Sequence, residues 1–201
     1  MPAIVPIVEG EGEVEAVPVL LRRLAAMLAP GLSLHLSRPI RVKRDKVVKP
    51  GELERAVELA ARLAGKQGAI LILLDAEDDC PATLAPSLLA RAKQARRDVP
   101  LSVVLAKREY EAWFLAAAES LRGQRNLALD LTSPPEPEQI RGAKEWLSRQ
   151  MKGVHAYTPA LDQAALTASL DLSTARRADS FDKCYREIAR LLNLLRRPNA
   201  K

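Results

Sequence analysis

AILILLDAEDD, residues 69–79, joins an unbroken apolar run to a cluster of acids. Its apolar half is typical of a strand that is buried on both faces in the middle of a parallel sheet. Acids then follow at Asp75, Glu77, Asp78 and Asp79, where the strand is expected to end. Carboxylates gathered in this way resist burial unless solvent or a cation relieves them. The stretch therefore predicts either a solvated acidic loop before the next helix or a divalent-metal site.

Strands and helices are expected to alternate on both sides of this stretch. Two more apolar runs predict buried strands, AIVPIV at 3–8 and LSVVLA at 101–106. The alternating segment 32–42 predicts an edge strand interrupted by Pro39. Helical patterns are found at residues 19–31, 52–66, 81–98 and 109–123. This order predicts an α/β fold with a mostly parallel sheet and helices on both faces.

The character of the chain changes after Gly123. The Pro-rich connection LALDLTSPPEPEQ occupies residues 127–139, and no strand pattern follows it. We therefore expect two parts, an α/β core over 1–123 and a helical C-terminal extension over 124–201 that packs on the core.

The composition excludes several classes of protein. With 48% hydrophobic and 28% charged residues, the 201-residue chain can build one globular core. Cys80 and Cys184 have no zinc-binding spacing, and His35 and His155 each lack a partner at metal-ligand spacing. The start of the sequence does not have the pattern of a signal peptide, and no run reaches the length of a membrane span, so we expect a cytoplasmic location and no membrane partner.

Charged residues follow three of the predicted strands. Glu9 follows the first strand, with Glu13 one helical turn later, and Lys107 follows the strand 101–106. Asp75 and Glu77 are two residues apart, so they point the same way in extended backbone. The carboxyl ends of parallel strands collect functional groups in α/β folds, so we expect these side chains on one rim.

Four motifs together resemble a known family: EGEGE at 9–13, LLDAEDD at 73–79, AKREYEAWFLA at 106–116 and ALTASLDLSTARRADSF at 165–181. They are similar to those of a Toprim-like family, a domain of unknown function related to the Toprim nucleases of the overcoming-lysogenization-defect type. The resemblance covers almost the whole chain. Genes of this family can lie beside ATPase genes in phage-defence settings, so the resemblance also implies a separately encoded ATPase as a partner.

The resemblance implies a set of metal ligands, Glu9, Glu13, Asp75 and Glu77, that hold Mg²⁺ or Mn²⁺ for chemistry at a phosphodiester. Glu77 stands where the family pattern prefers aspartate, and Asp79 is the alternative ligand at that position. The first glutamate of the pattern also implies an acid or base role for Glu9. Metals held by carboxylates polarise a phosphoryl oxygen and activate water, which agrees with this assignment.

Other residues near the rim receive secondary roles. We expect Lys107 to contact a phosphate, and it joins Glu9 and Asp75 as a candidate catalytic residue. Asp78, Glu109 and Glu111 are secondary acidic candidates, although Glu111 is equally typical of a helix start. We expect the aromatic residues Trp113 and Phe114 in the core.

A basic stretch provides a candidate nucleic-acid surface. With a net charge of +6, the chain concentrates cations in residues 38–49, and the candidate contacts are Arg38, Arg41, Lys43, Arg44 and Lys46. The alternative is a solvated edge strand that lysine protects from aggregation.

The sequence therefore predicts a metal-dependent nuclease or phosphodiesterase that acts on nucleic acid. A non-catalytic adaptor that binds an ATPase or a nucleotide stays open as the alternative, so enzymatic activity is left undecided. A small-molecule phosphotransfer enzyme is a weaker option, because such enzymes usually carry an aspartate nucleophile after the first strand and this chain has Glu9 there.

Overall fold

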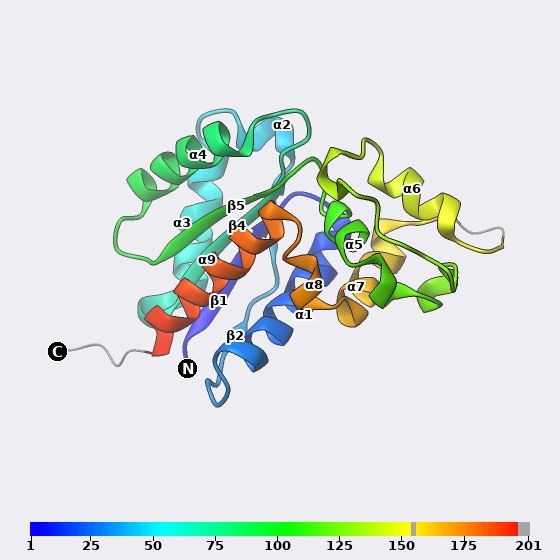
Figure 1. Cartoon of the computed structure of the whole chain (residues 1–201). Coiled ribbons are helices and arrows are strands. Elements are labelled where there is room, and N and C mark those ends of the chain that lie inside the picture. Colours follow the sequence, from blue (N-terminus) through cyan, green and yellow to red (C-terminus); the bar gives the residue numbers. More distant parts are fainter. Residues whose placement is uncertain (154–155, 197–201) are drawn as a thin grey trace.

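A five-stranded parallel sheet forms the centre of the computed structural model, which describes residues 1–153 and 156–196 (Figure 1). Its strands are β1 (Ala3–Val8), β2 (His35–Leu36), β3 (Ile40–Arg41), β4 (Ala69–Asp75) and β5 (Leu101–Ala106). They lie in the order β2-β1-β4-β5, and β3 also pairs with β1. The strands predicted at 3–8, 69–75 and 101–106 are thus confirmed. His155 and residues 197–201 lie outside the described residues.

The edge strand predicted for residues 32–42 is divided into two short strands. Both pair with β1 in parallel, through Ala3 opposite His35 and Ile7 opposite Ile40. Pro39 lies between them and has no N–H to donate to a ladder, which explains the interruption.

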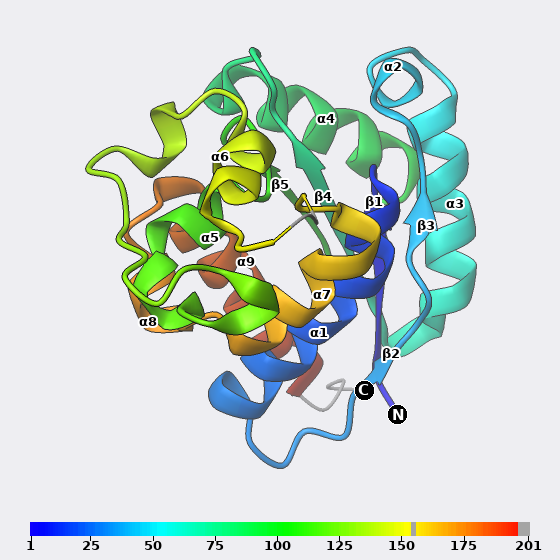
Figure 2. The same cartoon turned by 90° about the vertical axis from the view of Figure 1, so that its right-hand side faces the viewer.

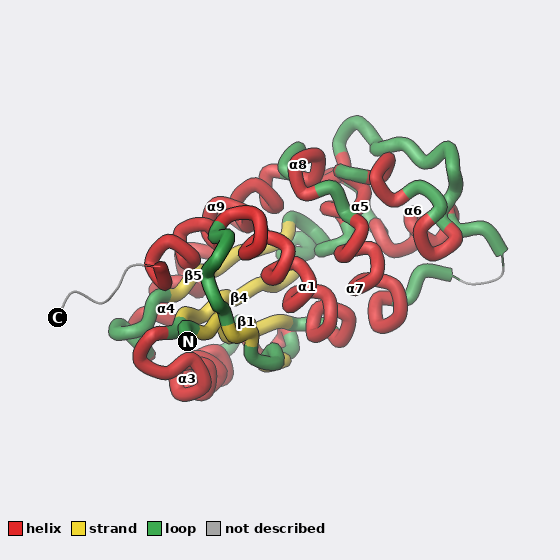
Figure 3. Tube along the Cα trace, turned by 90° about the horizontal axis from the view of Figure 1, so that it is seen from below, coloured by secondary structure: helices red, strands yellow, loops and turns green. Residues whose placement is uncertain are grey.

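Helices cover both faces of the sheet. One face packs against α1 (Glu11–Leu28) and α9 (Asp179–Arg196), and the other against α3 (Glu52–Ala64) and α4 (Pro81–Ala95). Figure 3 shows the strands between these two layers. A short helix, α2 (Arg44–Val47), lies between β3 and α3.

The side chains of β1 show why this strand is apolar throughout. Ile4 and Val8 join the core beneath α1 and α9, whereas Val5 and Ile7 join the core beneath α3 and α4. Alternate residues of a strand point to opposite faces, so a strand covered on both faces is apolar at nearly every position. The predicted α/β class with helices on both faces is confirmed.

The described chain after β5 contains helices and loops and no further named strand, as predicted for the part after residue 123. Its helices are α5 (Ala112–Ala116), α6 (Ala143–Gln150), α7 (Pro159–Ser169) and α8 (Leu172–Ala175), followed by α9. Figure 2 shows α7 alongside α1. Short 3₁₀ helices lie at Gly65–Gln67, Ala118–Leu121, Gln124–Asn126 and Pro137–Gln139. The division of the chain at residue 123 stays a prediction.

Two predicted helices have different lengths in the structure. The pattern at 109–123 predicts one helix, but α5 ends at Ala116 and a 3₁₀ turn follows, because Ala117 leaves helical geometry with φ −122° and ψ 34°. Conversely, α1 begins at Glu11, well before the predicted start, and includes Pro18.

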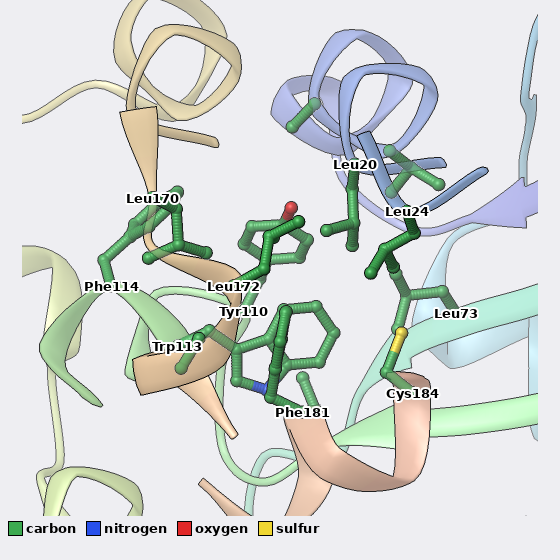
Figure 4. Close-up of a cluster of buried hydrophobic side chains, with 14 of the residues drawn as sticks. Leu20, Leu24, Leu73, Tyr110, Trp113, Phe114, Leu170, Leu172, Phe181 and Cys184 are labelled. Atoms are coloured by element: carbon green, nitrogen blue, oxygen red, sulfur yellow. The ribbon is translucent and has the colours of Figure 1, made fainter. Parts of the chain in front are cut away.

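An aromatic cluster anchors the segment after β5. Tyr110 and Trp113 have ring centroids 4.6 Å apart, and Trp113 meets Phe181 of α9 edge-on at 5.1 Å (Figure 4). Trp113 and Phe114 are fully buried, which confirms them as core residues. The cluster fixes the chain beside Glu109 and Glu111, and this segment carries part of the candidate site.

In the described part of the chain, no helix has the length and apolar character needed to cross a membrane.

Candidate functional site

The predicted acids lie where the strands of the sheet end. Asp75 is the last residue of β4, and Glu9 directly follows β1. Glu109 and Glu111 come after β5, next to α6 and α7. Since the strands are parallel, their carboxyl ends meet at one edge of the sheet, and the loops there form a common rim.

One group of rim acids is neutralised by basic side chains. Asp79 pairs with Arg44 of α2. Asp78 receives two arginines, Arg108 and Arg141, each at 2.9 Å. The side chains of Asp78 and Asp79 are 71% and 60% exposed, so these two acids lie at the outer part of the rim.

A second group has no basic partner. The carboxylates of Glu9, Glu13, Asp75 and Glu77 form no ion pair with any of the described residues. These are the four residues that the sequence motifs single out as metal ligands. Asp79, the alternative to Glu77, already has its counter-charge in Arg44.

Backbone groups orient two of these carboxylates. The N–H of Tyr110 donates to Asp75 Oδ1 at 2.8 Å, and the N–H of Gly10 donates to Glu13 Oε2. The second contact is half of a capping box at the start of α1, so Glu13 has a structural role as well. Glu9 is less satisfied, because its buried Oε2 has no hydrogen-bond partner in residues 1–153 and 156–196.

The unpaired acids lie close enough to affect one another's ionisation. Burial, followed by the charges of Glu77 and Glu13, raises the pKa of Glu9 from 4.5 to about 7. Burial also raises the pKa of Asp75, and the charges of Glu13 and Glu111 add to this effect. Glu13 thus links the two, and the rim holds more negative charge than its surroundings stabilise.

Lys144 of α6 supplies a cation that the sequence analysis missed. Its Nζ lies 2.9 Å from Glu109 Oε2 and 3.1 Å from Glu111 Oε2. Burial lowers the pKa of Lys144, but the charges of Glu111, Asp75 and Glu109 outweigh that effect and the pKa is raised.

Lys107, the lysine that the sequence analysis selected, forms no ion pair with the rim acids among the described residues. Its backbone N–H donates to Ser180 Oγ at 3.1 Å. The lysine in contact with the rim acids is Lys144. No local signal around residue 144 indicates this contact, because it depends on how α6 docks.

Glu111 is fully buried and is not a solvated acid at a helix start. Its Oε1 accepts hydrogen bonds from Tyr157 Oη at 2.9 Å and Gln163 Nε2 at 3.3 Å. Burial raises its pKa, and Lys144 opposes the rise. The sequence analysis named neither Tyr157 nor Gln163, which reach the site from the helical extension.

Two strained turns border a pocket of about 330 Å³ at the rim. Glu77 has φ 51° and Arg108 has φ 64°, values that non-glycine residues adopt rarely and that concentrate at functional sites. The N–H of Glu77 donates to the carbonyl of Arg108 at 2.8 Å, so the two turns hold each other. Eight residues line the pocket: Asp75, Glu77, Asp78, Arg108, Glu109, Arg141, Gly142 and Lys144.

The basic stretch lies on the side of the rim away from α6, where β3 pairs with β1 and α2 follows β3 (Figure 2). Arg41 Nε donates to the carbonyl of Glu9 at 3.1 Å, and Arg44 Nη2 donates to that of Ala76 at 3.4 Å. The other members are exposed: Arg38, Lys43 and Lys46.

The donors at the rim fit a hard divalent cation in their chemistry. They are carboxylate oxygens, which Mg²⁺ and Mn²⁺ prefer. Such an ion would satisfy the unpartnered Oε2 of Glu9 and would reduce the mutual repulsion of Glu9, Glu13 and Glu77. Among the described residues, however, no three acid, histidine or cysteine side chains already surround one point. Glu77 is exposed at its strained turn, so its side chain is free to rotate toward the others.

Comparisons with known proteins identify a family whose description names no activity. A family model described as "Domain of unknown function (DUF4276)" matches residues 8–189. The sequence matches no curated protein and no solved structure.

Proposed function

Because the chain belongs to the DUF4276 family, whose description names no activity, we propose its function from the rim itself: a Toprim-type nuclease that uses Mg²⁺ or Mn²⁺ to cleave phosphodiester bonds in nucleic acid.

One observation carries this proposal. Four carboxylates at the ends of β1 and β4, those of Glu9, Glu13, Asp75 and Glu77, have no ion-pair partner in the described chain, while the neighbouring acids are paired. Glu13 is buried, Glu9 and Asp75 are half-buried and Glu77 is exposed. Carboxylates that repel one another in a partly buried site are costly, and a divalent cation is a usual means of stabilising them. Their order along the chain also agrees with the Toprim pattern.

The bound ion would polarise a phosphoryl oxygen and lower the pKa of a water molecule. Glu9, Glu13, Asp75 and Glu77 would hold the ion, with Asp75 kept in place by the N–H of Tyr110. Glu9 would also have the acid or base role that the family resemblance implies. Lys144 holds Glu109 and Glu111 in position at the back of the site.

The basic stretch supports a nucleic-acid substrate. Arg41 and Arg44 contact the backbone next to Glu9 and Asp75, so a strand bound along this side would pass beside the carboxylates. Lys43 and Lys46 are exposed on the same segment and can contact further phosphates.

A non-catalytic adaptor is the second candidate, and one observation favours it. No three metal-binding side chains surround a common point in residues 1–153 and 156–196. In that case the charged rim would bind a partner, such as the separately encoded ATPase that the family resemblance implies, and the acids would act only through their charge.

Cleavage of nucleic acid tests the proposal. The protein is incubated with labelled single- and double-stranded DNA and RNA in Mn²⁺, in Mg²⁺ and in EDTA. We expect metal-dependent cleavage, and loss of at least about a hundredfold in the Asp75→Asn variant, since several kcal/mol of charge stabilisation are lost. Asparagine keeps an oxygen that can accept from Tyr110 N–H, so the fold is expected to survive.

Glu15→Gln is the matched control, because Glu15 is exposed on the same helix as Glu13. It should cleave at the wild-type rate. Equal rates for wild type and Asp75→Asn would identify a contaminating nuclease and contradict the proposal. Absence of cleavage on every substrate in both metals would favour the adaptor.

A further inference from the structure

Two arginines from different parts of the chain converge on one acid at the rim. Arg108 Nη1 and Arg141 Nη2 both lie 2.9 Å from Oδ1 of Asp78. Arg108 follows β5, whereas Arg141 precedes α6 in the helical extension. Asp78 therefore holds the two guanidinium groups side by side at the pocket that Asp75 and Glu77 also line.

The two guanidinium groups retain unused donors. Each has five N–H bonds; at the same Asp78 oxygen atom, Arg108 donates one hydrogen bond and Arg141 forms an ion pair. Nε of Arg108 is buried and has no hydrogen-bond partner in the described chain. A buried charged donor without a partner is costly unless a ligand satisfies it.

The backbone at Arg108 is strained at the turn that carries its side chain to Asp78. Its φ of 64° is rare for a residue with a side chain and is energetically costly. The bond from Glu77 N–H to its carbonyl maintains the turn. The strained turn directs Arg108 toward Asp78 on the neighbouring loop.

The charge of the pocket determines what it can accept. Four carboxylates and three cationic side chains line it, which gives a net charge of minus one. An anion is repelled in that state. A divalent cation at the neighbouring carboxylates would reverse the sign, and an anion would then be attracted.

We propose that Arg108 and Arg141 form a phosphate clamp, which binds a backbone phosphate of the nucleic acid once a divalent cation occupies the carboxylates. Guanidinium groups bind phosphate oxygens through paired N–H donors, which a lysine cannot do. Asp78 is the positioning residue that keeps the two arginines together. The clamp rests on the proposed metal-dependent function and assigns its substrate contact.

The test measures metal binding and nucleic-acid binding separately in the full chain. Calorimetry gives the affinity for Mn²⁺ alone, and fluorescence anisotropy gives the affinity for a short labelled single-stranded DNA, with and without Mn²⁺. Arg141→Gln is the main variant, because the Arg141 side chain is 72% exposed and its loss leaves the fold intact. Arg149→Gln, at an exposed position of the adjoining α6, is the control.

We expect Arg141→Gln to bind Mn²⁺ as the wild type does and to bind the DNA about tenfold more weakly in Mn²⁺, as lost charge-assisted hydrogen bonds predict. Arg149→Gln should stay within about twofold of wild type, as an exposed charge remote from the site does. Arg108→Lys keeps the charge but loses the fork of donors, so it should weaken DNA binding as well.

Equal DNA affinities for Arg141→Gln and Arg149→Gln, with Mn²⁺ binding intact, would overturn the clamp and leave the proposed function standing. If the wild type does not bind Mn²⁺, both are overturned. A mononucleotide provides the last comparison: if it binds as tightly as the DNA, the clamp recognises a terminal phosphate monoester and the assignment to a backbone phosphate is wrong.

Discussion

Replacing Lys144 by methionine should destabilise the protein by about 3 kcal/mol near pH 8, because Glu111 then loses its counter-charge. Methionine keeps most of the apolar length of the side chain and removes only the ammonium group. The change therefore isolates the electrostatic role of Lys144 in the site.

The magnitude follows from the contacts of Lys144. Its Nζ is 2.9 Å from Glu109 Oε2 and 3.1 Å from Glu111 Oε2. At an effective dielectric constant of about 20, unit charges this close attract by about 5 kcal/mol. Removing one partner of a buried pair costs about 3–5 kcal/mol. We take the lower end because the Lys144 side chain is 37% exposed, although that of Glu111 is fully buried.

Urea denaturation of the metal-free protein measures this loss. Glu111 can escape the cost by taking up a proton, so the destabilisation should be smaller near pH 5 than near pH 8. Adding Glu111→Gln to Lys144→Met should restore part of the stability, since the uncompensated charge is then gone. Lys152→Met, at an exposed lysine, is the control and should change stability little.

Two results would refute this reasoning. One is a Lys144→Met variant whose free energy of unfolding lies within about 0.5 kcal/mol of that of Lys152→Met. The other is a double variant that is no more stable than the single one. Either would mean that Lys144 does not balance the charge of Glu111.

Two further changes test other parts of the site. Gly12→Ala places a Cβ against Gln163 Oε1 and 2.8 Å from the carbonyl oxygen of Pro159, and the resulting clash forces α1 and α7 apart. The free energy of unfolding should therefore fall by about 2 kcal/mol; unchanged stability in urea would contradict this close contact. The metal-free protein should also lose stability as pH rises from 4.5 to about 7, because Glu9 ionises freely when unfolded but keeps its proton when folded. The full effect of about 3 kcal/mol is reduced by solvent screening to about 1 kcal/mol. Denaturation in EDTA at several pH values checks the prediction: Glu9→Gln should lose less stability over this range than wild type and keep the part due to Asp75 and Glu111, and an identical pH profile for both proteins would contradict it.

The central sheet could be predicted from the sequence because its strands carry an unambiguous pattern. Residues 3–8 and 69–74 are apolar at every position and residues 101–106 at every position except Ser102, a pattern typical of strands covered on both faces. Once the strands are known to be parallel, the positions of Glu9 and Asp75 at one edge follow from topology alone.

The contribution of the helical extension could not be predicted in the same way. Lys144, Tyr157 and Gln163 reach the rim because α6 and α7 dock there, and helical periodicity does not indicate where a helix docks. Glu111 illustrates the same limit, since an acid at a helix start looks alike in sequence whether it is solvated or buried. Arg141 lies outside any helix, where periodicity gives no information at all.

Calorimetric titration with Mn²⁺ near pH 8 is the decisive measurement, because the proposed chemistry requires that Glu9 and Asp75 share one ion. Wild type, Glu9→Gln, Asp75→Asn and the control Glu15→Gln are compared at low ionic strength. We predict that wild type and Glu15→Gln bind Mn²⁺ alike and that each of the other two variants binds at least about tenfold more weakly. Equal Mn²⁺ affinities in all four proteins, or no binding in any, would contradict a metal site at the ends of β1 and β4.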